Sequence, residues 1–110
     1  MEIDYKTNKL KKSLGTPRDI AANYGTKAKL VNQRLKEFEA AISLYDISLL
    51  PKANLHQLYG ERKGCLAVDV SANFRIIFEP YHDPVPRTED GSLSLNAITK
   101  IKILSIEDYH

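Results

Sequence analysis

The spacing of the apolar residues changes near Pro51, and this change restricts the chain to folds in which helices precede strands. Before Pro51, apolar residues recur at spacings of four, three, four and three, which places them along one face of an amphipathic helix. These residues are Val31, Leu35, Phe38, Ile42 and Tyr45. After Pro51, apolar residues alternate with others, as a half-buried strand requires. Because proline disfavours helical backbone at the residue before it, the helix should end before Pro51.

Three strands are predicted after Pro51, over residues 66–70, 74–80 and 98–107. The first two show alternation, and the third, "AITKIKILSI", is rich in β-branched residues. In the second strand Phe74 and Ile76 share one face, so Arg75 should point to the opposite face. Apolar and polar residues also alternate in "MEIDY", which predicts a short first strand.

Two helices are predicted in the first half of the chain, over residues 16–24 and 27–48. Thr16 can cap the first helix, Pro17 suits its first position, and Gly25 can end it. The segment "YHDPVPRTEDGSLSLN" contains two prolines and an Asp-Gly turn signal, so residues 80–97 should form a loop or a projecting hairpin. This order of elements indicates an α+β fold, with two N-terminal helices packed on one face of a small antiparallel sheet.

The 110 residues, of which 43% are hydrophobic, suffice for a single domain over residues 1–110. The one cysteine, Cys65, rules out an intrachain disulfide and a zinc site built from cysteines, and we expect it to be a small buried apolar residue. No apolar run approaches the length of a membrane span, and the N-terminal residues lack the apolar core of a signal peptide. We therefore expect a cytoplasmic protein without a membrane partner.

The charged residues are distributed unevenly, although the net charge is only +2. Residues 1–64 hold 12 Lys and Arg against 7 Asp and Glu, whereas residues 65–110 hold 4 against 7. The basic half can face a polyanion such as RNA. Charge alone leaves a chance distribution over a solvated surface equally open.

Two stretches of the second half carry polar residues suited to chemistry: "LHQLYGERKG", followed by "FRIIF", and the closing "EDYH". Together they resemble the HigB branch of the RelE-like toxins of bacterial toxin–antitoxin systems. The resemblance is clearest over residues 53–79 and 101–110 and covers the helical half in outline. It implies a RelE-like toxin fold and a ribosome-dependent endoribonuclease that cuts mRNA in the decoding site, without a metal ion or another cofactor.

The same resemblance implies partners and site residues. The partners are the ribosome with its mRNA, a helix-turn-helix antitoxin of the HigA type, and operator DNA reached only through the antitoxin complex. The positions that match catalytic roles are His56, Arg75, Asp108, Tyr109 and His110. The residues implied to bind RNA or phosphate are Arg62 and Lys63. Both lie in the stretch "GERKG", residues 60–64, which we call the glycine turn. The sequence departs from the family at Leu66 and Phe74, where tryptophan is common, and in its longer segment 80–97.

The residues also suit this chemistry when they are considered without the resemblance. Metal-independent RNA cleavage needs a base for the 2′-hydroxyl, a cation for the phosphate and an acid for the departing 5′-oxygen. Histidine serves as acid or base near neutral pH, and arginine binds phosphate oxygens in a bidentate way. If the last predicted strand pairs beside residues 74–79, its end should emerge near the glycine turn.

Each of these residues also has an ordinary structural explanation. His56 can cap a turn, Arg75 can pair with Glu79 or Asp69, and His110 can be exposed and idle. Two other functions stay open as well. One is a gyrase-poisoning toxin, which would bind its target without this catalytic set, and the other is an inactive module that only binds a partner.

Overall fold

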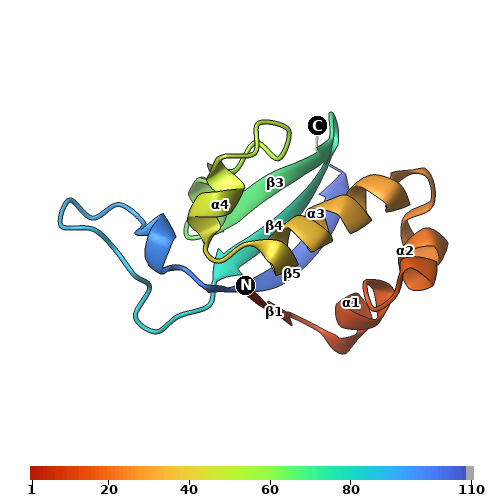
Figure 1. The fold of residues 1–110 in the computed structure, drawn as a ribbon, viewed down its shortest axis with the longest axis horizontal. Helices are drawn as coiled ribbons and strands as arrows, with labels where there is room; N and C mark the ends of the chain where they lie inside the picture. The colour runs from red at the N-terminus through yellow and green to blue at the C-terminus, as the bar shows by residue number, and fades with distance from the viewer. Residues whose placement is uncertain (109–110) are drawn as a thin grey trace.

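The computed structural model of the protein describes residues 1–108 (Figure 1). Strand β1 (Glu2–Tyr5) is followed by the helices α1 (Asn8–Ser13), α2 (Pro17–Tyr24), α3 (Ala28–Ala40) and α4 (Leu44–Ser48). The strands β2 (His56–Gln57), β3 (Leu66–Ser71), β4 (Phe74–Pro80) and β5 (Lys100–Asp108) come next. Short 3-10 turns lie between them, namely η1 (Gly25–Lys27), η2 (Gly60–Arg62) and η3 (Leu95–Ala97). No helix within residues 1–108 is long and apolar enough to cross a membrane.

The strands form one sheet in the order β1-β5-β4-β3-β2. Strands β2 to β5 pair in antiparallel fashion, but β1 runs parallel to β5, with Ile3 opposite Ile101. The prediction of an antiparallel sheet is therefore wrong at this edge, where the sheet is mixed. A parallel pair needs a long crossover, and most of the chain lies between β1 and β5 to supply it. Alternation of apolar residues carries no information about strand direction, so this parallel pairing could not be predicted from the pattern.

The first predicted helix is confirmed as α2, and its cap explains where it begins. The Asp19 N–H donates to Thr16 Oγ1 at 3.1 Å, and the Thr16 hydroxyl donates to Asp19 Oδ2 at 2.9 Å. These reciprocal bonds and Pro17 at the first position start the helix. The helix ends at Gly25, where φ is 53°. The shorter helix α1 was not predicted, although Thr7 caps it by accepting a bond from the Leu10 N–H.

The prediction of a single helix over residues 27–48 is wrong, because the helix is interrupted at residues 41–43. There the Ile42 N–H donates to Asp46 Oδ2 at 2.8 Å, and the Leu44 N–H donates to the Ile98 carbonyl at 2.9 Å. Both amide groups therefore donate to acceptors outside the hydrogen-bond pattern of a continuous helix. Ile42 is 83% exposed as a result, instead of continuing the buried stripe.

Helices α3 and α4 lie over the same face of the sheet, and the hydrophobic core fills the space between them and the strands (Figure 1). The rings of Phe38 on α3 and Phe78 on β4 meet edge to face, with centroids 5.2 Å apart. The sheet contributes Leu66, Val68, Ile76, Phe78, Ile101 and Ile103, all buried. Each fully buried side chain of this kind contributes roughly 1.5–3 kcal/mol through removal of its surface from water. The core therefore fixes which strand residues face away from the helices.

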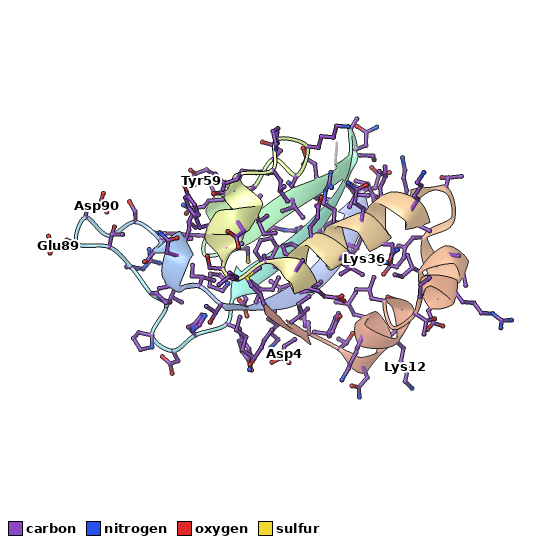
Figure 2. The ribbon with its side chains drawn as sticks, in the orientation of Figure 1. Asp4, Lys12, Lys36, Tyr59, Glu89 and Asp90 are labelled. Carbon is purple, nitrogen blue, oxygen red and sulfur yellow. The ribbon has the colours of Figure 1, made fainter. Side chains whose placement is uncertain are left out.

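The segment between β4 and β5 projects from the body of the molecule as an extended loop (Figure 1). Arg87 and Leu93 form an isolated antiparallel bridge, and Gly91 closes the turn with φ at 88°. Glu89 and Asp90 lie at the tip, directed away from the sheet and helices (Figure 2). The prediction of a loop or projecting hairpin over residues 80–97 is thus confirmed.

Candidate active site

The cross-strand register gathers polar side chains on the face of the sheet that points away from α3. Asp69 on β3 lies opposite Arg75 on β4, and Arg75 lies opposite Glu107 on β5. Residues directly opposite one another share a face of the sheet. We call this surface the charged face and define it by Asp69, Arg75, Ser105 and Glu107. The predicted orientation of Arg75, opposite to Phe74 and Ile76, is confirmed.

The glycine turn brings Arg62 to the same surface. Gly60 and Gly64 flank it with φ at 68° and 94°, a backbone conformation that other residues rarely adopt. The Cys65 N–H donates to the Arg62 carbonyl at 2.9 Å and closes the turn. Because the end of β5 lies beside this turn, the predicted proximity of the two is confirmed.

Arg62 and Arg75 converge on the carboxylate of Glu107. Arg62 Nη1 lies 2.7 Å from Glu107 Oε1, and Arg62 Nη2 donates to Glu107 Oε2 at 3.2 Å, so the pair is bidentate. Arg75 Nη2 lies 4.0 Å from Glu107 Oε1. The Ser105 hydroxyl donates to Glu107 Oε2 at 3.0 Å. Two cations from different elements thus share one anion.

The charge state of Glu107 follows from these contacts. Partial burial acts to raise the pKa of its carboxyl group, but hydrogen bonds from Arg62 and Ser105 act in the other direction, as do the charges of Arg62 and Arg75. Together, burial, the hydrogen bonds and the arginine charges hold the pKa of Glu107 below its usual value. Glu107 is therefore an anion at neutral pH and unsuited to act there as a proton donor.

A groove of about 370 Å³ adjoins this cluster. It is lined by Lys6, Arg62, Cys65, Ile77, Leu104, Ser105 and Glu107. Cys65 is only partly buried, which corrects the prediction of a buried position. Burial and then the charge of Glu79 raise the pKa of the Cys65 thiol, against the lowering effect of Arg62 and Lys6, so its thiol form is favoured. Lys6 and Arg62 make this groove suitable for an anion.

His56 lies on the edge strand β2, opposite Ala67, which in turn lies opposite Ile77. The register therefore places His56 on the charged face, with its Cα about 12 Å from that of Arg75 by strand spacing and rise. His56 Nδ1 lies 2.7 Å from the Asn54 carbonyl. Because a carbonyl only accepts hydrogen bonds, Nδ1 carries the hydrogen, and Nε2 of the neutral ring is left as the proton acceptor.

The remaining predicted residues are not gathered into this cluster. Lys63 follows Arg62 in the turn and is exposed. Asp108 is exposed and lies opposite Phe74, so strand alternation directs it to the other face from Glu107. Tyr109 and His110 lie outside the described residues. Within residues 1–108, no group of three or more His, Cys, Asp or Glu side chains is placed to hold a metal ion.

Sequence reasoning missed Glu107, Ser105 and Tyr59. Glu107 contacts both arginines and Ser105 donates to Glu107, and the feature that reveals both residues is the register of β5 against β4. Tyr59 directly precedes the glycine turn and is 83% exposed (Figure 2). An exposed aromatic ring next to this turn can stack on an unpaired base, and its position next to "GERKG" is the sequence feature that could have indicated it.

No family model matches the chain, and no curated protein matches its sequence. Solved structures do match it. YafQ from E. coli strain BL21(DE3) gives a TM-score of 0.57 at 11% identity, over 97% of this chain and 91% of that chain. A YoeB/ParE toxin from Agrobacterium tumefaciens gives 0.55 at 8% identity, over 100% of both chains. The chain has the fold of the RelE-like toxins.

A YoeB-YefM complex from Staphylococcus aureus also has the RelE-like fold in common with this chain, with a TM-score of 0.51 at 15% identity over 100% of this chain and 97% of that chain. The RelE-like fold thus spans essentially the whole sequence. These structures do not distinguish the HigB branch that the sequence motifs resemble.

Proposed function

We propose that the protein is the toxin of a bacterial toxin–antitoxin system and that it cleaves mRNA on the ribosome by acid–base chemistry without a metal ion. The observation that carries this proposal is the convergence of Arg62 and Arg75 on one anion. The same face carries His56, whose Nε2 is available to accept a proton. A cation pair and a neutral histidine are two of the three requirements of this reaction.

The proposed roles follow from these positions. Arg62 and Arg75 bind the scissile phosphate and stabilise the charge that develops on it. His56 takes the proton of the 2′-hydroxyl. The resemblance of "EDYH" to the HigB ending supplies Tyr109 and His110 as candidates for the acid that protonates the leaving oxygen. Asp108 belongs to the same motif, but strand alternation directs it to the opposite face from Glu107. Lys63, exposed beside Arg62, adds positive charge for the RNA backbone.

The proposed partners are the ribosome with its mRNA and a helix-turn-helix antitoxin of the HigA type, which would connect the complex to operator DNA. Support for an antitoxin comes from the similar fold of the toxin in the YoeB-YefM complex. The uneven charge distribution supports RNA as the polyanion that the basic half faces.

The proposal is tested by mapping mRNA cleavage in a translation extract with the parent protein, Arg75→Ala and Arg87→Ala. Arg87 is the matched control, because it lies in the projecting loop and its Nη1 donates only to the Gly91 carbonyl among the bonds described. We expect Arg75→Ala to lower the cleavage rate about 10²–10³-fold, as does loss of one donor to a developing negative charge. Arg87→Ala should cleave like the parent. Equal cleavage by all three proteins would make Arg75 structural.

Chelation provides a second test of the mechanism. The parent protein should cut mRNA on pre-assembled ribosomes that are transferred briefly into EDTA, since the proposed acid and base need no metal. Loss of cutting that a divalent ion restores, with the ribosomes shown to be intact, would contradict the mechanism. Arrest of growth or translation without any cut in the RNA would favour the alternative of a toxin that inhibits another target by binding.

A further inference from the structure

Resting on the proposed function, we propose that Glu107 occupies, in the RNA-free protein, the place of an RNA phosphate. Binding of RNA then requires the phosphate to replace the Glu107 carboxylate on Arg62 and Arg75. Glu107 is in this sense an internal competitor that determines which phosphates the arginine pair accepts.

The geometry of the arginine pair is the first step of the argument. Both terminal nitrogens of Arg62 reach the two oxygens of Glu107, at 2.7 and 3.2 Å. A guanidinium group binds a phosphate through the same fork of two parallel hydrogen bonds. Arg75 approaches the same carboxylate from β4, at 4.0 Å. The carboxylate therefore stands where two arginines would hold a phosphate.

The exposure of the pair allows the exchange. The side chains of Arg62 and Glu107 are 44% and 30% exposed, and ion pairs open to water contribute little to stability. The Arg34–Glu37 pair differs, because the Arg34 side chain is only 5% exposed and its Nε also donates to the Asp69 carbonyl at 2.7 Å. Of these two ion pairs, Arg34–Glu37 is fixed, whereas water and a ligand can reach Arg62–Glu107.

Two neighbouring features accommodate the protein both without RNA and with a phosphate in place of the Glu107 carboxylate. Ser105 holds Glu107 Oε2 at 3.0 Å, so the carboxylate keeps a hydrogen-bond donor after Arg62 leaves it. The groove of about 370 Å³ beside Arg62 and Lys6 has room for a phosphate group. The exchange therefore leaves neither anion without a partner.

This competition predicts how the protein selects its substrate. Glu107 is tethered next to the arginines, so its effective concentration is high, and a free RNA phosphate competes poorly. A phosphate that other contacts already hold in place competes well. RNA presented by the ribosome is such a ligand, and Glu107 thereby disfavours free RNA.

The test measures binding of a short, non-cleavable 2′-deoxy oligonucleotide by fluorescence anisotropy at low salt. Glu107→Gln keeps the shape of the side chain and removes its charge, and we expect binding about tenfold tighter than the parent's, since one repulsive unit charge near the phosphate is removed. Ser105→Ala removes the donor that the carboxylate keeps after Arg62 leaves it, so it should weaken binding relative to the parent. Glu61→Gln is the matched control, an exposed glutamate of the same turn, and should stay within about twofold of the parent.

Binding by Glu107→Gln that is equal to or weaker than the parent's would overturn the inference, as would the absence of measurable binding by both proteins. Thermal unfolding checks that each variant is folded, and Ser105→Ala supplies the answer if Glu107→Gln is not. Cleavage of ribosome-bound mRNA by the parent is measured separately. Tighter binding by Glu107→Gln with no cleavage by the parent would retain the phosphate site and reject the endoribonuclease.

Discussion

At the residue scale, Asn54 links His56 to the charged face through an uncommon backbone conformation. Its φ is 46°, in the left-handed region that residues with a Cβ rarely adopt and that asparagine tolerates best. Its amide Nδ2 donates to Asp69 Oδ2 at 3.0 Å, while its carbonyl accepts the bond from His56 Nδ1. The orientation of the His56 ring therefore depends on a residue that takes no part in the proposed chemistry.

A pair of substitutions separates the backbone effect from the side-chain effect at this position. Both Asn54→Gly and Asn54→Ala remove the bond to Asp69, but only glycine adopts a positive φ without strain. We expect Asn54→Ala to be about 1–2 kcal/mol less stable than Asn54→Gly. Urea denaturation of the two variants measures the difference. Equal stabilities would show that the backbone relaxes at this turn.

The lowered pKa of Glu107 predicts a pH dependence of stability. Because the folded-state pKa lies below the ordinary value of 4.5, ionised Glu107 stabilises the fold above that pH. This contribution is lost as the pH falls through the folded-state pKa. The free energy of unfolding of the parent should therefore exceed that of Glu107→Gln at pH 7, and the gap should close in acid. A gap that stays constant from pH 7 to pH 3 would exclude ionisation of Glu107 as its cause.

At the element scale, the local sequence pattern correctly predicted the helices and strands that depend on neighbouring residues. It failed where contacts between distant residues determine the structure. Helix α2 carries its own cap, and strands β3 and β4 alternate regularly, so all three were found. The break after Ala40 depends on Asp46 and on the Ile98 carbonyl, which lies in a distant segment. No local pattern contains that information.

The same limit explains why part of the site was missed. Arg75 could be placed because its own strand alternates, and Arg62 because glycines flank its turn. On β5, however, Ile101 and Ile103 face the core, and simple alternation would place Ser105 and Glu107 beside them. The register shifts between Ile77 and Phe78, which pair with Ser105 and Ile103. Leu104 is therefore the extra residue of a bulge, which moves Ser105 and Glu107 to the charged face.

Removal of the side-chain bond at the helix break tests its importance. Asp46→Ala leaves the Ile42 N–H without this acceptor, and loss of such a cap typically costs about 1 kcal/mol. We expect a lower midpoint of urea denaturation with an unchanged slope. Glu89→Ala, which removes one negative charge from the exposed loop tip, should unfold like the parent and serves as the control. Identical midpoints for the two variants would show that the helix break does not depend on the Asp46 side chain.

At the scale of the whole molecule, the projecting loop is separate from the body that carries the core and the charged face. Its tip, residues 88–92, is exposed, and the bridge between Arg87 and Leu93 closes it off. Under the proposed function, this tip is available to contact the ribosome or the antitoxin without disturbing the arginine pair.

Shortening the loop tests this separation. Replacement of residues 88–92 by Asn-Gly provides a two-residue hairpin turn beyond the Arg87–Leu93 bridge. We expect the free energy of unfolding to change by no more than about 0.5 kcal/mol, because the removed residues are exposed. Calorimetry measures this change. A large loss of stability would show that the tip supports the fold.

The central position of β5 in the sheet has a consequence for synthesis. Strand β5 lies between β1 and β4, yet it is the last of these strands to be translated. While the nascent chain grows, β1 has no neighbour to pair with, and the outer edge of β4 stays unsatisfied. Contacts between residues so far apart in sequence also form slowly. A partly synthesised chain therefore contains Arg62 and Arg75 but no finished sheet around them. The activity proposed for the protein can arise only after residues 100–108 have left the ribosome that made them.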